Sequence, residues 1–281
     1  TSFADIEKKE NRKDLIISIC VFLSGFSCFA QLYYFQPLLP DLAKDFILSA
    51  SESSFAISFS TLGMVFGLFT TMFVADRIPR KKMIGTGLLS SSIFSVAASF
   101  SPTFLPLILL SAAKGFLLSG ATSVSMAYIA EEVSSRNKGK IMGLYIAGNA
   151  LGGMAGRVIS SWIGALYTWR IASVSIGLIC ALFAILFLLF SPRSTNFMPR
   201  KESFHTLIIA NLQLITSKAL IPFYLTGGLI LGVFIQLPGI LSDQSTFQFP
   251  GTLYPLYLFN VYIRYFRVDC DSRTHPVLHS F

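Results

Sequence analysis

The sequence predicts an all-α, polytopic membrane protein, and three observations lead to that prediction. About seven apolar runs follow one another between Leu15 and Val233, each close to the roughly 20 residues with which an α-helix crosses a bilayer. Hydrophobic residues make up 53% of the chain and charged residues only 13%, and the mean hydropathy is +0.65. Most charges lie in short clusters between the runs, so the runs lack the polar face that a helix of a soluble protein turns toward water.

Seven membrane-spanning helices are expected. In chain order they span 15–40, 53–75, 83–101, 104–130, 140–165, 171–191 and 218–237. The first follows a polar leader, residues 1–14, and its apolar stretch is longer than the roughly 7–15 residues of a signal peptide, so we expect a retained helix. The polar stretch 192–217, which contains prolines and charges of both signs, separates six closely connected helices from the seventh.

The basic residues lie mainly on one side of the predicted membrane. With the N-terminus in the cytoplasm, the outer segments hold only Lys44 and Arg170. The cytoplasmic segments hold Lys8, Lys9, Arg12, Lys13, Arg77, Arg80, Lys81, Lys82, Arg136, Lys138, Lys140, Arg193, Arg200 and Lys201. This asymmetry predicts a cytoplasmic N-terminus. It also accounts for the net charge of +8 without nucleic acid as a partner.

The last segment, residues 238–281, differs in composition from the rest of the chain. Residues 1–219 contain 22 alanines and residues 220–281 contain none, where about six would be expected at the same frequency. Aromatic residues crowd together there, and Pro238, Pro250 and Pro255 would interrupt any helix. We interpret the segment as an aberrant, aromatic-rich tail whose abrupt start resembles a change of reading frame, and we assign no function to it.

Residues that bind metals or act in catalysis are scattered. The chain has four cysteines and three histidines: Cys20, Cys28, Cys180, Cys270, His205, His275 and His279. The cysteines show no paired spacing and three lie in apolar runs, so we expect buried thiols rather than disulfides or metal ligands. No histidine lies in a predicted helix of the first six. The sequence therefore indicates no metal site, no cofactor and no catalytic residue.

A charged loop joins the second and third expected helices. Its sequence is Asp76-Arg77-Ile78-Pro79-Arg80-Lys81-Lys82. Asp76 follows the C-terminal end of a helix, where arginines can hold its carboxylate and aim it at the N-terminus of a partner helix. A plain positive-inside loop would account for the basic residues but not for Asp76. Asp76, Arg77, Arg80 and Lys81 are in register with Gly-x-x-x-Asp-Arg-x-Gly-Arg-Arg/Lys, so the loop resembles the cytoplasmic loop signature of the major facilitator superfamily; Met72 and Pro79 replace its two glycines.

The fifth expected helix carries a second motif, made of Gly139, Gly148, Gly152, Gly153 and Gly156. These residues follow the spacing Gly-x8-Gly-x3-Gly-(Pro)-x2-Gly, with Gly153 in the proline position. Gly148, Gly152 and Gly156 are four residues apart and share one helix face, where small residues let a neighbouring backbone approach closely. Generic helix packing needs only two or three of these glycines. The full set resembles the antiporter signature of the same superfamily.

The two motifs make the chain, from about Leu15 to Val233, similar to bacterial efflux carriers of this superfamily. Trp169-Arg170 at the start of the sixth helix supports the resemblance, whereas the family's Arg-x-x-Gln-Gly in the fourth helix is replaced by Ser111-Ala112-Ala113-Lys114-Gly115. The resemblance implies a six-helix N-terminal half of two three-helix repeats, followed by a partial second half. It also implies that the Asp76 loop is a cytoplasmic gate, and that the gate and the glycine face find their partners in the second half.

Two basic residues lie inside the predicted membrane core. Lys114 is about 11 residues into its helix, hence about 16 Å deep, where an ammonium costs several kcal/mol unless it faces water, a partner or a ligand. Arg157 lies in the outer half of the fifth helix, within snorkelling reach of the interface. We expect a substrate cavity lined by Gln36, Lys114 and Arg157. The six helices show no core carboxylate that could carry a proton, which leaves proton counter-transport open.

The resemblance favours export of a small organic solute across a bacterial inner membrane by alternating access. A full carrier of this family has twelve helices, more than this chain supplies, so a truncated, transport-incompetent relic that only inserts in the membrane is the alternative. A membrane enzyme is disfavoured by the scattered histidines. The expected partners are the lipid bilayer and the solute, and we expect a monomer.

Overall fold

The computed structural model describes residues 3–195, 197, 217, 220–222 and 225–229, without the side chains of residues 3–9. Its internal contacts divide the chain into two units, Thr1–Pro199 and Arg200–Phe281, and the fold below is that of the first. Within the expected seventh helix, 218–237, residues 221–222 and 225–229 are described and helical. The rest of that helix, most of the linker 192–217 and the whole tail 238–281 lie outside the described residues.

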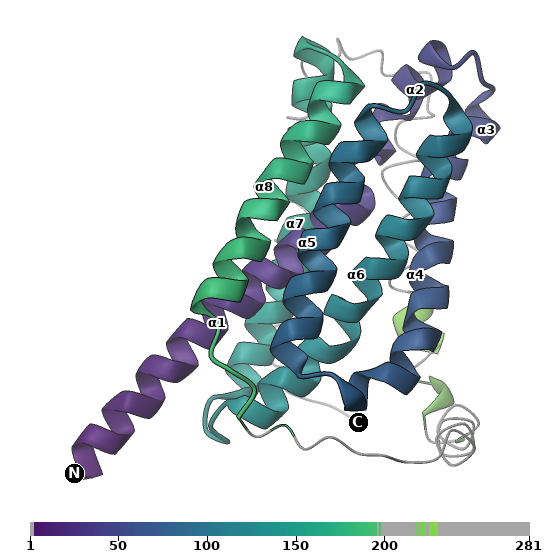
Figure 1. Ribbon diagram of the computed structural model, residues 1–281. Coiled ribbons are helices and arrows are strands. Elements are labelled where there is room, and N and C mark those ends of the chain that lie inside the picture. The colour runs from purple at the N-terminus through teal and green to yellow at the C-terminus, as the bar shows by residue number, and fades with distance from the viewer. Residues whose placement is uncertain (1–2, 196, 198–216, 218–219, 223–224, 230–281) are drawn as a thin grey trace, which may run out of the picture. The chain divides into compact units, whose positions relative to one another are not determined.

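Helices and the short connections between them make up the described part of the first unit, which confirms the all-α class (Figure 1). Six are long: α1 (Phe3–Tyr33), α4 (Phe55–Val74), α5 (Arg80–Ser99), α6 (Phe104–Glu132), α7 (Lys138–Leu166) and α8 (Trp169–Phe190). The short ones are η1 (Gln36–Leu38), α2 (Leu39–Asp45), α3 (Ala50–Ser53) and η2 (Ala75–Arg77). The ends of α4 to α8 lie within three residues of those expected from hydropathy.

The first helix differs from its expected span of 15–40. It begins near the N-terminus, because the polar leader is rich in residues that favour helix, and it ends at Tyr33. Proline has no backbone N–H and disfavours helix in the residue before it, so Pro37 prevents the helix from continuing. The chain restarts as η1 and α2, each with a proline in its first turn.

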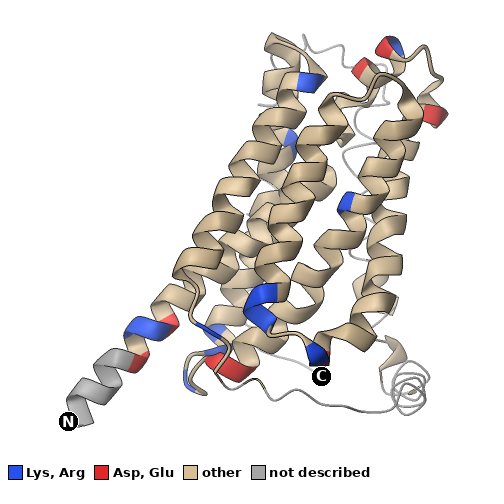
Figure 2. Ribbon diagram, viewed as in Figure 1, with Lys and Arg blue, Asp and Glu red and all other residues tan. Residues whose placement is uncertain are grey.

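Four segments of the described chain are long and apolar enough to cross a membrane: Glu10–Asp45, Ala50–Arg77, Phe104–Glu132 and Trp169–Phe190. Helices α5 and α7 fall short because their sequences include several serines or glycines and basic residues. Charged residues gather at the two ends of the bundle, and only isolated Lys or Arg positions interrupt its uncharged middle (Figure 2). We call the end of the bundle that contains Asp76 the Asp76 end, and the opposite end, which contains Asp45, the Asp45 end.

The neighbours of each helix follow a pattern of two three-helix repeats. The most extensive contacts join α1 with α7, α4 with α6, α5 with α6, α1 with α8, and α5 with α8. Exchanging α1, α4 and α5 with α6, α7 and α8 maps this set of pairs onto itself. The arrangement agrees with the repeats expected for the six-helix half.

Glycines make two of these helix pairs very close. A Cβ built on Gly152 of α7 would lie 2.2 Å from the carbonyl oxygen of Phe26 in α1, and Gly148 and Gly156 meet the same helix one turn away on either side. In the other repeat, a Cβ on Gly63 of α4 would lie 2.0 Å from the carbonyl oxygen of Ala112 in α6. The expectation that the α7 glycines face the second half is therefore wrong, because α1 of the same half occupies that face.

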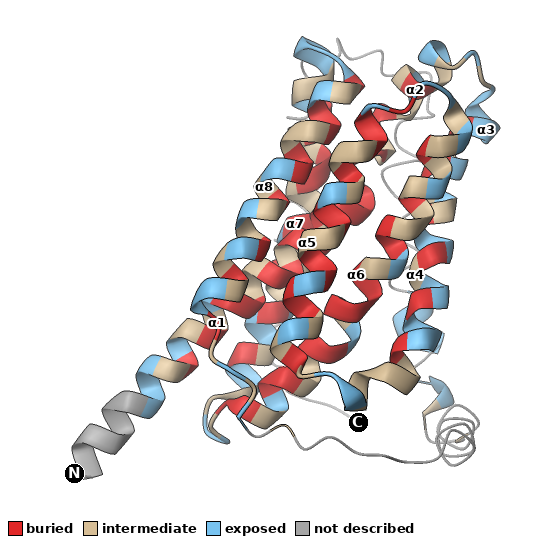
Figure 3. Cartoon of the chain, viewed as in Figure 1, coloured by how far each residue is buried: buried red, intermediate tan, exposed pale blue. Residues whose placement is uncertain are grey.

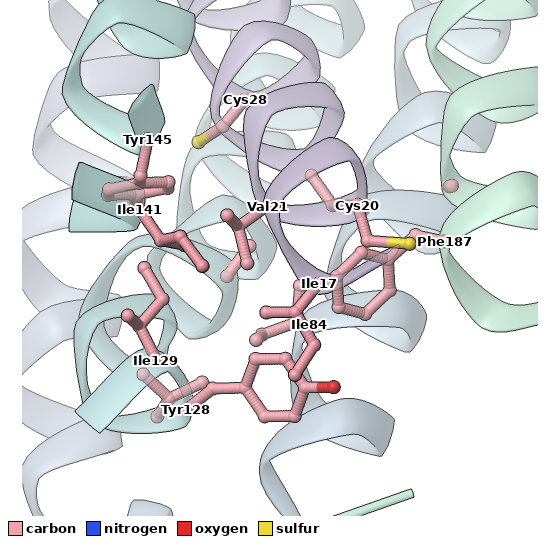
Figure 4. Close-up of a cluster of buried hydrophobic side chains, with 14 of the residues drawn as sticks. Ile17, Cys20, Val21, Cys28, Ile84, Tyr128, Ile129, Ile141, Tyr145 and Phe187 are labelled. Atoms are coloured by element: carbon pink, nitrogen blue, oxygen red, sulfur yellow. The ribbon is translucent and has the colours of Figure 1, made fainter. Parts of the chain in front are cut away.

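Two apolar clusters fill the bundle, one toward each end. Figure 4 shows the cluster nearer the Asp76 end, where Ile17 and Val21 of α1, Ile84 of α5, Ile129 of α6 and Phe187 of α8 converge. Buried faces point inward and exposed faces outward along each long helix (Figure 3). The outward faces are themselves apolar; on α8 they include Leu178, Leu182, Leu189 and Phe190, as a helix facing lipid requires.

The cysteine prediction is confirmed for three residues. Cys20, Cys28 and Cys180 are free and buried. Cys270 lies outside the described residues.

Candidate functional site in the membrane interior

The predicted site residues meet at the place where α1 ends. We call Tyr33–Gln36 the aromatic turn, because three aromatic residues precede Gln36. The turn is fixed from two sides: Ser160 of α7 donates a hydrogen bond to the carbonyl oxygen of Tyr34 (2.8 Å), and the Tyr34 hydroxyl is hydrogen-bonded to that of Ser173 in α8 (2.9 Å). Tyr34 and Phe35 are almost completely buried.

Arg157 of α7 holds one side of the aromatic turn. Its Nε donates to Oε1 of Gln36 (2.6 Å), its Nη1 donates to the carbonyl oxygen of Gly153 (3.2 Å), and its guanidinium carbon lies 4.4 Å from the centroid of the Tyr33 ring. The residue is 1% exposed. The structure therefore joins two of the predicted cavity residues, Gln36 and Arg157, and encloses Arg157 within the helix bundle.

Lys114 of α6 approaches the same turn. Its Nζ lies 4.4 Å from the centroid of the Tyr34 ring and 4.8 Å from that of Phe35, close enough for cation–π attraction to both rings. The residue is 1% exposed, and its Nζ has no hydrogen-bond acceptor within the part of the chain that the structure describes. All three predicted residues thus contact the aromatic turn or belong to it.

Within the described residues, no acidic side chain pairs with Lys114. In residues 10–195 the acidic residues lie toward the two ends of the bundle or in the connections (Figure 2): Glu10, Asp14, Asp41, Asp45, Glu52, Asp76, Glu131 and Glu132. A charged group in the membrane interior is costly, and such groups pair with one another or mark a binding or transport path. The enclosed Lys114 is therefore a candidate contact for a ligand.

A chain of buried polar groups supports the aromatic turn from behind. Ser173 donates to the carbonyl oxygen of Ser95 (3.0 Å), Ser95 to Oε1 of Gln31 (3.2 Å), and Gln31 to Oγ of Ser27 (3.3 Å). These residues belong to α8, α5 and α1, so the chain ties three helices to the hydroxyl of Tyr34. A hydrogen-bonded network of this kind fixes the ring of Tyr34 and therefore the position of Lys114 against it.

At the Asp76 end, Arg80 is the centre of the loop motif. Its Nη2 lies 2.9 Å from Oδ1 of Asp76 and 3.1 Å from Oε1 of Glu131 in α6, and its Nη1 donates to the carbonyl oxygen of Ala75 (2.5 Å). Burial alone would lower the pKa of Arg80, but the hydrogen bonds to Glu131 and Asp76 outweigh it and raise the pKa. Arg77 is exposed. The motif therefore joins α5, η2 and α6 through one guanidinium.

Lys81, the last member of the loop motif, holds the chain that follows α8. Its Nζ donates to the carbonyl oxygen of Ser191 (2.5 Å), and its backbone N–H donates to Oγ of Ser194 (3.1 Å). Tyr128 of α6 is hydrogen-bonded to Ser191 (2.8 Å) and donates to the carbonyl oxygen of Pro192 (2.9 Å). The first residues of the linker are thus fixed to α5 and α6.

The opposite end is closed by Arg170 of α8, which the sequence analysis did not assign to a site. Its guanidinium donates to the carbonyl oxygens of Ser99 (2.8 Å) and Ser101 (3.0 Å) and pairs with Asp45 (3.0 Å). The indole N–H of Trp169 donates to the same carboxylate (3.0 Å). This cluster ties α2 to the ends of α5 and α8.

The partners that the sequence analysis missed are of two kinds. Tyr33, Tyr34 and Phe35 precede a predicted site residue directly, and three adjacent aromatic residues at a helix end were the available signal. Glu131 lies 51 residues from its partner Arg80, and only the fold brings the two together. Gly139, the first residue of the glycine motif, has no described residue within 4 Å of its would-be Cβ, whereas Gly153 lies beside Tyr33 and Arg157.

A multi-pass helical bundle with charged groups enclosed among its apolar helices defines a membrane protein of the transporter class. The profile of the Major Facilitator Superfamily matches residues 18–264, so the chain belongs to that superfamily of transporters. The match extends beyond Val233, the limit that the motifs alone suggested.

Several relatives are transporters of bacteria. The chain is 35% identical to an uncharacterized transporter of Buchnera aphidicola (subsp. Schizaphis graminum) over 84% of this chain and 57% of that protein. It is 35% identical to the inner membrane transport protein YnfM of Escherichia coli K12 over 79% of this chain and 53% of YnfM, and 31% identical to the MFS-type transporter YybF of Bacillus subtilis over 79% and 55%. The chain spans less than two thirds of the length of these relatives.

Proposed function

We propose that the protein is a carrier that exports a small organic solute across a bacterial inner membrane by alternating access. The observation that carries the proposal is the pair of basic residues, Lys114 and Arg157, buried against one aromatic turn inside the helix bundle. Interior charge of this kind marks a solute path in membrane proteins. The relatives named as transporters, among them an inner membrane protein, support the same function.

The solute would bind among α1, α6 and α7, with Gln36, Lys114 and Arg157 as its contacts. The loop residues Asp76, Arg77, Arg80 and Lys81 would form the cytoplasmic gate, with the N-terminus on the same side. Arg80 supports this role because it bridges α6 and the end of α4 through Glu131 and Asp76. We assign no proton-carrying carboxylate to the described helices, and we propose that the protein acts as a monomer.

Export is tested in an efflux-deficient bacterial strain that expresses the protein. Accumulation of fluorescent dyes and labelled sugars is compared with that of cells carrying an empty vector, and lower accumulation supports export. Glu131→Gln removes a charged partner of Arg80 and should slow export about tenfold if the gate loses roughly 1.4 kcal/mol of bias. Lys82→Gln, a change at an exposed lysine of the same helix, should leave export unchanged. Equal rates for both variants would contradict the gate.

The orientation is tested separately with single cysteines. Pro79→Cys and Ser135→Cys place thiols at the Asp76 end, in the connections before α5 and between α6 and α7. A membrane-impermeant maleimide added outside intact cells should not label them, whereas it should label them in inside-out vesicles. Labelling from outside would reverse the proposed orientation.

A further inference from the structure

Lys114 is an unusual residue even for a transporter interior. Its ammonium is buried at 1% exposure, and it faces two aromatic rings instead of a carboxylate. Ring faces attract the cation but cannot accept all of its N–H groups, and the described residues offer Nζ no hydrogen-bond acceptor. The described structure therefore leaves a buried, charged donor incompletely satisfied.

The residues around it show which ligand would satisfy it. Arg157, a second buried cation, contacts the same four-residue turn at Tyr33 and Gln36. The buried acidic residues of the described bundle, Asp14 and Glu132, lie at the Asp76 end, and neither pairs with Lys114. An anionic oxygen is the group that accepts hydrogen bonds from an ammonium most strongly. The rings of Tyr34 and Phe35 add apolar surface beside the cation.

We propose that Lys114 and the aromatic turn form the binding site for an organic anion, whose carboxylate or sulfonate accepts hydrogen bonds from Nζ. This rests on the proposed transport function and specifies its substrate class. The ring of Tyr34 is fixed by Ser173 on one side, so Lys114 stays aligned while the anion takes its open hydrogen-bonding positions. Because Lys114 is enclosed, the anion enters only when the surrounding helices separate, as alternating access requires.

A purely structural role is the rival explanation. In that case the ammonium only stacks on the two rings, and its removal weakens the bundle. The two explanations differ in the effect of Lys114→Met. If Lys114 belongs to a binding site, its unsatisfied charge destabilises the ligand-free protein, and Lys114→Met should be more stable than the parent. If Lys114 only stacks on the rings, Lys114→Met loses that attraction and should be less stable than the parent.

Binding is measured on the purified full chain in detergent by thermal unfolding, in a Cys270→Ser background. A thiol-reactive fluorogenic dye then reports exposure of the buried Cys20, Cys28 and Cys180. The probes are benzenesulfonate, which is always charged, and benzenesulfonamide, its neutral analogue. Saturating benzenesulfonate should raise the melting temperature by roughly 5 °C or more, and the sulfonamide should not. Lys82→Met, at an exposed lysine, is the matched control and should respond like the parent protein.

Variants of Lys114 distinguish a binding site from a purely structural role. Lys114→Met without ligand should melt above the parent and should lose the response to benzenesulfonate, and Lys114→Arg, which keeps the charge, should retain part of it. Equal responses to both probes, an undiminished response of Lys114→Met, or a lower melting temperature of ligand-free Lys114→Met would overturn the proposal. Export of an anionic dye that is unaffected by Lys114→Met would also overturn it while the transport function stands. Benzenesulfonate binding without export of any solute would contradict the transport function alone.

Discussion

Replacing Gly152 by alanine tests the close contact between α7 and α1. A Cβ at this position would lie 2.2 Å from the carbonyl oxygen of Phe26 and 2.5 Å from its Cα. Both are backbone atoms, so no side chain can turn away to make room. The matched control is Gly143→Ala in the same helix, where no described residue lies within 4 Å of the added Cβ.

The expected magnitude follows from two opposing effects. An ordinary contact begins near 3.4 Å, so the helices must separate locally by about 1.2 Å, the difference from 2.2 Å. Such overpacking costs about 1–3 kcal/mol. Alanine favours helix over glycine by about 1 kcal/mol at either site, and this gain cancels when the two variants are compared. Gly152→Ala should therefore be less stable than Gly143→Ala by about 1–3 kcal/mol.

Thermal unfolding in detergent measures this difference, with the buried thiols Cys20, Cys28 and Cys180 as reporters. At roughly 2–4 °C per kcal/mol, Gly152→Ala should melt about 2–12 °C below Gly143→Ala. Equal melting temperatures would show that α1 does not approach α7 this closely, and the account of the glycine contact would then be wrong.

Two further variants test the ends of the bundle. Tyr128→Phe removes the hydrogen bonds to Ser191 and Pro192. Tryptic cleavage after Arg193 should then become several-fold faster, because each lost hydrogen bond is worth about 1 kcal/mol. Unchanged cleavage would mean that Tyr128 does not hold the linker. Arg170→Gln should lower the melting temperature more than Asp45→Asn: the exposed ion pair contributes about 0–1 kcal/mol, whereas Arg170 also donates to two carbonyl oxygens at the end of α5.

Hydropathy was enough to predict the all-α class and the ends of the later helices. Each of these helices is bounded by a polar or charged connection, so the change in composition and the end of the helix coincide. The first helix is the exception, because the residues on both sides of Pro37 are apolar. Apolar composition continues into α2 although the helical backbone stops at Tyr33. The expected helix 15–40 could have been divided only by giving more weight to Pro37, which interrupts a helical backbone.

The site could be predicted only in part. Gln36, Lys114 and Arg157 were identified as polar or charged residues in apolar surroundings, and this can be recognised from the sequence of each segment alone. Their joint contact with Tyr33, Tyr34 and Phe35 depends on how three helices pack, and apolar aromatic residues near a helix end equally suit a membrane interface. The partnership of Arg80 with Glu131 depends on the same packing.

The glycine contacts also limit how this half of the protein can move. Shear between packed helices usually proceeds by small rotamer changes in the side chains between them. Where Gly148, Gly152 and Gly156 bring α7 against the backbone of α1, that layer of side chains is missing, and a slide of one residue would drive side chains into the opposing backbone. Helices α1 and α7 should therefore travel as one rigid body, and α4 and α6, joined at Gly63 and Gly67, as another.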